Sequence, residues 1–208
     1  MASQESVLDL TKTLTSKGRR TRSNLVQAAR EVFEEKGYDE ARIAQISERA
    51  GIAYGGFYTY FDSKHEIFRQ VIKGVTGDMW TASRSGLSPD ATPVERIREA
   101  TEHYLVAYQN NAQMMHVLES VSPRDDGFRQ LLLEIRATFL SRIVGGTRRL
   151  QEAGLAQSDI DLELTASVLG GMVEHAARMW FLMGQAPDQE VLMQTLTRIW
   201  ARGIGLNI

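Results

Sequence analysis

Apolar residues recur along this 208-residue chain at spacings of three and four, and this helical period is the feature that most limits its fold. The first clear stripe runs from Leu25 to Phe33 and is followed by Gly37, a residue that commonly ends helices. No segment shows the alternation of a half-buried strand. The sequence therefore predicts an all-α fold of about nine helices. We expect these helices over about residues 21–36, 42–50, 54–61, 64–80, 93–108, 114–120, 126–152, 162–183 and 189–200.

Composition excludes several classes of protein and of site. Cysteine is absent, which excludes disulfides, thiolate zinc sites and cysteine nucleophiles. Glu5 and Asp9 stand where a signal peptide would need positive charge followed by an apolar run. No stretch approaches the roughly 20 apolar residues of a membrane-spanning helix. We therefore expect a cytoplasmic protein with no membrane partner.

Charge is distributed unevenly along the chain. Residues 12–73 hold 12 Lys and Arg against 8 Asp and Glu, whereas residues 74–208 hold 12 against 16. Residues 1–20 have weak periodicity and end in a basic cluster, which predicts a flexible basic N-terminal arm. The concentration of positive charge in the first third indicates that the two parts of the chain have different partners.

The segment between Arg42 and Lys64 has the spacing of a helix-turn-helix, because a short helix, a tight turn at Gly51 and a second short helix follow in order. In such a motif the second helix enters the major groove of DNA. Its inner face would pack through Phe57, Tyr60 and Phe61. Its outer face would present Tyr54, Gly55, Tyr58 and Thr59. Spacing alone does not separate this motif from an ordinary helical hairpin with surface tyrosines.

Residues 20–73 resemble the DNA-binding segment of the TetR (tetracycline-repressor-like) family of transcriptional regulators. The motifs that carry the resemblance are Ala28-Ala29, Phe33, Lys36-Gly37-Tyr38, Ile46, Ala50-Gly51-Ile52, Gly55, Phe57-Tyr58, Tyr60-Phe61 and Ser63-Lys64. The resemblance implies that Tyr58 and Lys64 hold phosphates of double-stranded DNA. It also implies that Tyr54, Gly55 and Thr59 face base edges.

Three positions depart from the family's pattern. Arg42 replaces the threonine that usually opens the second helix, Ala53 replaces the capping serine, and Gly56 replaces a hydroxyl residue. These substitutions put the family's phosphate contacts at the three positions in doubt. A guanidinium at position 42 can still reach a phosphate, and we keep Arg42 and Gly56 among the expected DNA-binding residues.

The resemblance further implies a helix-turn-helix domain over residues 21–66 and a helical ligand-binding and dimerisation domain over 67–208. The expected ligand pocket comprises Met79, Tyr104, Tyr108, Met115, Phe139, Met172, His175 and Met179. Plain core packing is the alternative for each of them, and Arg136 is interpreted as a solvated flank. The expected dimer interface comprises Gly170, Gly171, Phe181, Leu196 and Trp200.

These features favour a transcriptional repressor that binds a palindromic operator as a homodimer and is released by a small, largely apolar effector. We expect no enzyme activity, catalytic residue or cofactor, because no P-loop, Gly-x-Ser-x-Gly or dinucleotide motif is present. We expect no metal, because the four histidines lack the paired spacing of a helical zinc site. Two alternatives stay open. One is a helical small-molecule or protein-binding module with a degenerate DNA-binding segment, and the other is a metal sensor that uses His103, His116 or His175.

Overall fold

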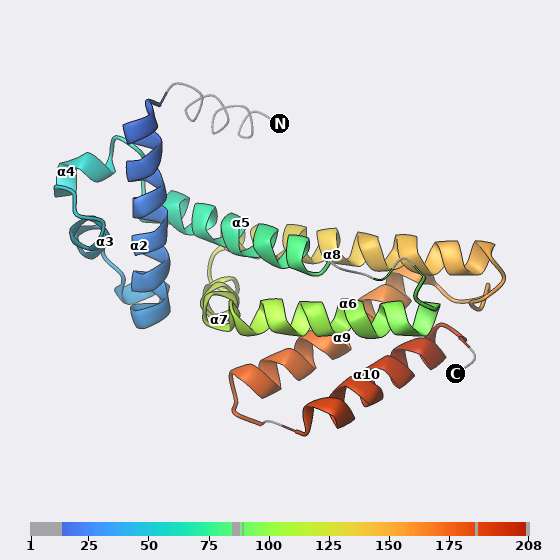
Figure 1. Ribbon diagram of the computed structural model, residues 1–208. Helices are drawn as coiled ribbons and strands as arrows, with labels where there is room; N and C mark the ends of the chain where they lie inside the picture. The colour runs from blue at the N-terminus through green and yellow to red at the C-terminus, as the bar shows by residue number, and fades with distance from the viewer. Residues whose placement is uncertain (1–13, 85–87, 89, 186, 207–208) are drawn as a thin grey trace. The chain divides into compact units, whose positions relative to one another are not determined.

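A computed structural model of the protein describes residues 14–84, 88, 90–185 and 187–206, and within this part of the chain it is all-helical (Figure 1). The helices are α2 (Ser16–Glu40), α3 (Ile43–Arg49), α4 (Tyr54–Phe57), α5 (Lys64–Ala82), α6 (Pro93–Gln109), α7 (Ala112–Val121), α8 (Asp126–Glu152), α9 (Leu162–Phe181) and α10 (Gln189–Gly203). The predicted fold class is therefore confirmed, with nine helices over these residues.

The described residues form two compact units, and the chain passes from the first to the second between Gly74 and Val75, inside α5. The domain boundary expected after residue 66 also falls inside α5, eight residues earlier. Across the described residues, no helix is long and apolar enough to cross a membrane.

The first unit is built around aromatic side chains from α2, α4 and α5. Phe33 meets Phe68 edge to face with ring centroids 4.9 Å apart, and the Tyr38 ring lies 5.0 Å from Phe68. Phe57 and Phe61 are fully buried in the same unit, as their spacing predicts. The burial of Phe57 holds α4 in place, because a helix of four residues is too short to be stable on helix propensity alone.

α2 begins five residues before its predicted start at residue 21. Thr15 caps it, since the Thr15 hydroxyl accepts a hydrogen bond from the Gly18 backbone N–H at 3.1 Å. Residues 16–20 of the predicted arm are therefore helical, and residues 1–13 of that arm lie outside the described residues. Near its other end α2 is kinked at Gly37, whose φ of 72° lies in the left-handed region that favours glycine.

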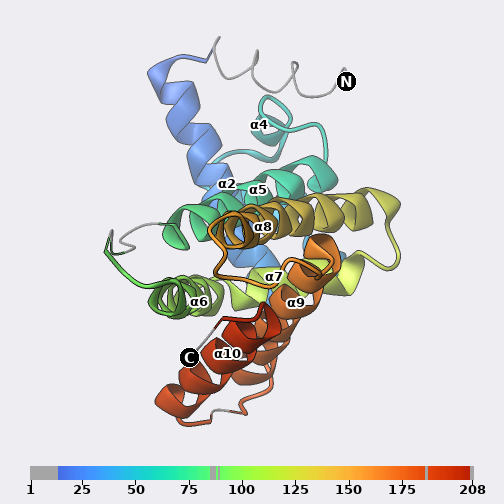
Figure 2. The same ribbon diagram turned by 90° about the vertical axis from the view of Figure 1, so that its right-hand side faces the viewer.

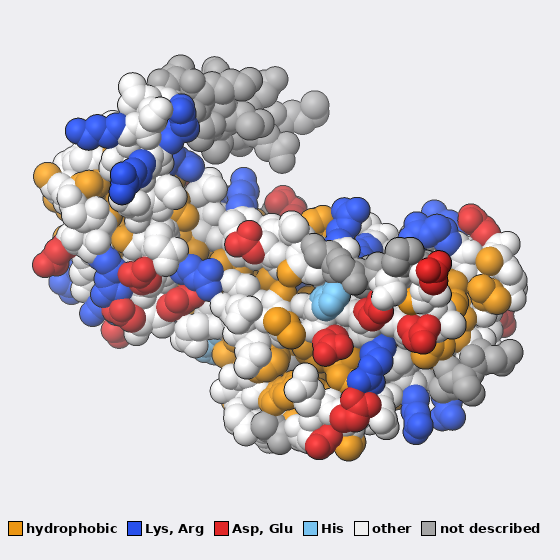
Figure 3. All heavy atoms as spheres, in the orientation of Figure 1, with side chains coloured by type: hydrophobic (Ala, Val, Ile, Leu, Met, Phe, Trp, Pro, Cys, Tyr) orange, Lys and Arg blue, Asp and Glu red, His pale blue; other side chains and the backbone are white. Residues whose placement is uncertain are grey.

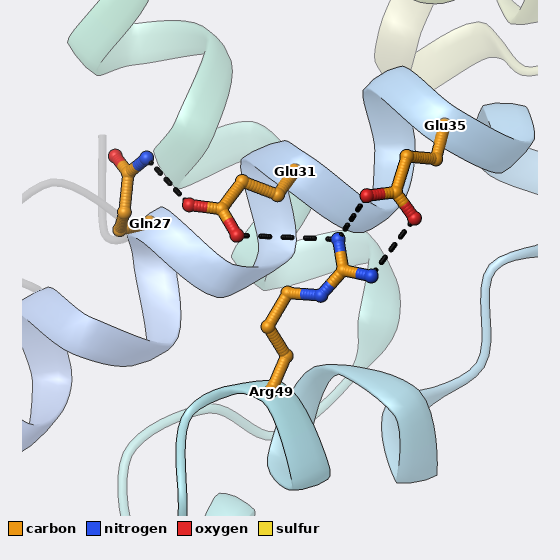
Figure 4. Close-up of polar contacts among 4 residues, drawn as sticks. All are labelled: Gln27, Glu31, Glu35 and Arg49. Atoms are coloured by element: carbon orange, nitrogen blue, oxygen red, sulfur yellow. Dashed lines mark hydrogen bonds and ion pairs between the residues drawn. The ribbon is translucent and has the colours of Figure 1, made fainter.

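A charged network joins α3 to α2 (Figure 4). The Arg49 guanidinium donates two hydrogen bonds to the Glu35 carboxylate, at 2.5 and 2.8 Å, and lies 3.9 Å from Glu31. Glu31 in turn accepts a hydrogen bond from Gln27 at 2.9 Å. The hydrogen bond from Arg49 lowers the pKa of Glu35. The bidentate geometry fixes the direction of α3 on α2.

The second unit contains the last residues of α5 and helices α6 to α10. α9 packs against α8, α6 and α10, and α10 also packs along α6 (Figures 1 and 2). One core cluster comprises Leu169, Ala201, Ile204 and Leu206, with Val94, Ile97 and Leu150 against it. This cluster brings the start of α6 beside the end of α8.

Side-chain caps begin three helices of the second unit where the sequence predicts them. Thr92 and Glu95 form a reciprocal capping box, and Pro93 occupies the first helical turn. Asp161 and Asp188 cap α9 and α10 by a single bond each, in which the carboxylate accepts from the backbone N–H three residues later. The predicted starts of these three helices are confirmed.

Candidate functional site

α3, a tight turn and α4 form a helix-turn-helix in the first unit. Gly51 has a φ of 70°, and the Ile52 N–H donates to the Ser47 carbonyl at 3.0 Å, which reverses the chain after α3. α4 then covers only residues 54–57, so the prediction of a helix of about eight residues is wrong. Ala53 offers no side-chain cap and two glycines follow it, so only hydrogen-bonded turns continue to Phe61.

The predicted DNA-reading side chains lie on the outer surface of this segment. Tyr54 is 55% exposed and Tyr58 is 47% exposed, and Gly55 and Thr59 are exposed as well. The Tyr54 and Tyr58 hydroxyls are 3.1 Å apart, and this hydrogen bond raises the pKa of Tyr58. The Tyr58 hydroxyl therefore stays protonated at neutral pH, and because one hydroxyl donates to the other, the pair keeps one O–H donor for a ligand.

The two glycines of α4 differ in what surrounds them. A Cβ added at Gly55 would have no atom within 4 Å, whereas one added at Gly56 would lie 3.6 Å from Ile52 Cδ1, an ordinary contact. Neither glycine has a positive φ. The first unit would therefore accept alanine at both positions, so its own packing does not explain the glycine at position 55.

Lys64 is engaged inside the unit. Its ammonium donates to the backbone carbonyls of Tyr38, Asp39 and Ala41 at 2.8, 3.3 and 3.0 Å, and lies 4.4 Å from the Tyr38 ring centroid. Burial lowers the pKa of Lys64, and nearby Asp39 opposes that shift. All three N–H donors are in use, so a phosphate contact would require one of these bonds to break.

Arg42, the other cation expected at DNA, is exposed at the N-terminal cap of α3. Further positive charge lies in the first turns of α2, which the sequence assigned to a flexible arm. This segment contains Lys17, Arg19, Arg20 and Arg22, whereas the last ten residues of α2 contain Glu31, Glu34, Glu35, Asp39 and Glu40. Figure 3 shows Lys and Arg gathered over the start of α2. Cations at the positive end of a helix dipole are unfavourable for the helix but attract anions.

The second unit contains a cavity of about 600 Å³. Side chains from the end of α5, from α6 and from α8 form much of its wall. The structure brings four of the eight predicted ligand-binding residues to that wall, namely Met79, Tyr104, Met115 and Phe139. Other lining residues that the sequence did not single out include Ile97, Leu132, Ile135, Leu140, Ile143 and Val173.

The other four predicted pocket residues lie elsewhere. Tyr108 is fully buried and is not among the lining residues, and Met172 packs against the core cluster of Leu169 and Ala201. His175 and Met179 line a separate, more open pocket. The rotation of α9 about its axis explains why His175 and Met179 do not line the cavity, since this helix turns Gly170, Val173 and Glu174 toward it.

Charged groups also line the cavity, and Arg136 is one of them. Its guanidinium pairs with the Glu174 carboxylate across the wall at 2.6 Å, so the interpretation of Arg136 as a solvated flank is wrong. Arg142 donates to the hydroxyl and carbonyl oxygens of Ser83 at 2.7 and 2.6 Å. Arg96 and Arg149 line the cavity where the start of α6 meets the end of α8.

The residues predicted for the dimer interface have different surroundings in the second unit. Leu196 is buried, Trp200 lines the cavity, and Phe181 stacks on Trp180. A Cβ added at Gly170 would touch Leu140 and Ile143, whereas nothing lies within 4 Å of one at Gly171. The exposed apolar side chains of α9 and α10 are instead Leu164, Val168, Val191 and Ile199. Leu196 and Trp200 are thus used within the second unit, and the dimer interface itself stays a prediction.

The three histidines considered as metal ligands are not brought into a metal site. In the portion of the chain that the structure describes, no group of three or more His, Cys, Asp or Glu side chains is arranged to hold a metal ion.

Comparison with known proteins identifies the family. Residues 25–71 match the model of the tetR family of bacterial regulatory proteins. The HTH-type transcriptional repressor KstR2 of Mycobacterium tuberculosis is 30% identical over 185 residues, covering 84% of this chain and 88% of that protein. The fatty acid metabolism regulator protein of Bacillus subtilis is 24% identical over 182 residues, covering 86% and 93%.

A solved structure has the same fold. The transcriptional regulator FadR from Bacillus subtilis in complex with stearoyl-CoA superposes with a TM-score of 0.74 at 21% identity, over 88% of this chain and 98% of that one. The helix-turn-helix, the all-helical second unit and the extent of the KstR2 match all indicate the same family. The chain belongs to the TetR family of bacterial regulatory proteins.

Proposed function

We propose that this regulator is a repressor that leaves its operator when an amphipathic effector, a long-chain acyl-CoA or a molecule of similar chemistry, occupies the cavity of the second unit. The cavity carries this proposal, because its walls are mainly apolar while Arg96, Arg142 and Arg149 lie among its lining residues. Apolar walls suit an acyl chain, and guanidinium groups suit carboxylate or phosphate oxygens. The B. subtilis relative bound to stearoyl-CoA supports the same class of effector.

The DNA-binding half of the proposal rests on the outer surface of α4 and the start of α2. Tyr58 would donate to a phosphate, Arg42 would reach a second one, and the cations of α2 would add sequence-independent affinity. Tyr54, Gly55 and Thr59 would meet base edges. The alternative of a degenerate DNA-binding segment is disfavoured, since this surface presents two exposed tyrosines beside the N-terminus of α4, which has no side-chain cap.

The regulator would act as a homodimer joined through α9 and α10. Leu164 and Val168 are 64% and 62% exposed on α9, and Val191 and Ile199 are 59% and 48% exposed on α10. Such side chains form an apolar face that a second copy would cover, giving a two-fold four-helix interface. A two-fold dimer implies a palindromic operator.

Two measurements test this function. Selection of bound fragments from the genome that encodes the protein yields the operator, and fluorescence anisotropy then follows its release as acyl-CoA is added. We expect release by long-chain acyl-CoA and none by free coenzyme A, which lacks the apolar chain. Equal release by both, or failure to select any DNA, would refute the proposal.

A further inference from the structure

The cavity has a second polar region, distant from the arginines where α6 begins and α8 ends. It contains the Arg136–Glu174 ion pair, whose side chains are 37% and 24% exposed, and both residues line the cavity. Arg136 and Arg149 are 13 residues apart on α8, which places them about 20 Å apart along the helix axis. A ligand that spans the cavity therefore meets charged groups at both ends.

Tyr104 lies beside this ion pair and lines the same wall. Its hydroxyl makes no hydrogen bond to any residue that the structure describes. Burial raises the pKa of Tyr104, and the Glu174 carboxylate raises it further while Arg136 opposes the shift. The phenol is therefore a neutral donor, held close to the ion pair and without a partner of its own.

A plain alkyl end would be a poor occupant of this region. It would take the Tyr104 hydroxyl and the ion pair out of contact with water and offer them no hydrogen bond in return. A buried donor that is left unsatisfied is costly, whereas a ligand oxygen that accepts from it removes this cost. Sites built to hydrogen-bond a ligand group discriminate strongly against analogues that lack the group.

We propose that Tyr104, Arg136 and Glu174 form a polar subsite for a hydroxyl or carbonyl oxygen at the far end of the effector's apolar body. The effector is thus polar at both ends, with its anionic group at Arg96 and Arg149 and its second oxygen at Tyr104. This inference deepens the proposed function and rests on it, since it assumes that the cavity receives the effector.

Binding to the purified full chain tests the subsite without any need for operator DNA. Isothermal titration would compare acyl-CoA thioesters of 8 to 16 carbons with partners of equal length that carry a hydroxyl on the terminal carbon. We expect the hydroxylated member of the best-fitting pair to bind at least about tenfold more tightly, the effect of roughly one well-formed hydrogen bond to an otherwise unsatisfied group.

Tyr104→Phe and Tyr108→Phe form a matched pair of variants. Both tyrosines lie on α6 one turn apart, with rings 6.1 Å from each other, and the Tyr108 hydroxyl is also unpaired among the described residues. Only Tyr104 lines the cavity. We expect Tyr104→Phe to reduce the preference for the hydroxylated thioester to within about threefold, and Tyr108→Phe to leave it near the wild-type value.

The results separate this inference from the proposed function. Equal or tighter binding of the plain thioester, or a preference that survives Tyr104→Phe, would overturn the subsite while leaving an acyl effector in place. Thioesters that bind with the expected preference but do not release operator DNA would support the subsite and refute the proposed mechanism of release. No binding by either series would overturn both.

Discussion

Replacing Lys64 by methionine tests whether its ammonium stabilises the fold or binds DNA. The substitution keeps most of the side chain's length but removes hydrogen bonds to the carbonyls of Tyr38, Asp39 and Ala41 and the contact with the Tyr38 ring. Each bond contributes about 0.5–1.5 kcal/mol net, and an exposed cation–π contact about 0.5–1 kcal/mol. Because water can partly replace the lost donors, we expect a loss of about 2–4 kcal/mol in the free energy of unfolding.

Urea denaturation at fixed protein concentration measures this loss, since the stability of the proposed dimer would depend on protein concentration. Lys36→Met is the matched control, because Lys36 is exposed on α2 and makes no hydrogen bond to any described residue. We expect the control to change stability by less than about 0.5 kcal/mol. Hydrogen exchange should also accelerate at residues 38–42 in Lys64→Met alone.

The opposite result is equally distinct. If Lys64 instead binds a DNA phosphate, its substitution would leave the free energy of unfolding unchanged. The substitution would then lower the slope of log affinity against log salt by about 0.9. If Lys64→Met lowers that slope by this amount while the urea midpoint stays at the wild-type value, the bonds to the three carbonyls add no stability and the ammonium contacts a phosphate in the DNA complex. The assignment of Lys64 to the fold would then be refuted.

Three further predictions concern other surfaces. Gly55→Ala and Gly56→Ala should each raise the free energy of unfolding by up to about 1 kcal/mol. Gly55→Ala, whose methyl enters open space on the outer surface, should weaken operator binding in an anisotropy titration. Gly56→Ala, whose methyl meets Ile52, should leave operator binding unchanged, contrary to the expectation from the sequence that Gly56 contacts DNA. Val168→Asp should yield monomers in sedimentation; an intact dimer would exclude this face. Because Arg49 lowers the pKa of Glu35, their pair stabilises the fold at neutral pH, and this stabilisation is lost as the pH falls through the lowered pKa. Arg49→Met should therefore flatten the acid side of the stability profile, and an unchanged profile would contradict this reasoning.

The fold could be predicted well because its signals are local. Helix starts at Thr92, Asp161 and Asp188 depend on a side chain and a backbone N–H three residues later, so the sequence contains both partners within one turn. The stops at Gly37 and Gly51 depend on a backbone conformation that favours glycine. The start of α2 was misplaced because Thr15 precedes a run of cations that resembles a flexible arm.

The cavity was predicted less well because its geometry depends on helix rotation. α9 has apolar residues on two faces, one with Val173 toward the cavity and one with Val168 toward solvent. Periodicity identifies both faces but does not say which one turns inward. The same ambiguity assigned Arg136 to solvent, since its partner Glu174 lies 38 residues away on another helix.

The role of Lys64 could not be predicted from the sequence for a different reason, because its partners are backbone carbonyls. A carbonyl has the same chemistry in every residue, so nothing in the sequence of residues 38–41 signals that three of them converge on one ammonium. The convergence follows from the kink at Gly37, which ends the regular part of α2 just before this segment. The resemblance to the family supplied a lysine at the right position, and only the structure shows that its three donors are already used within the fold.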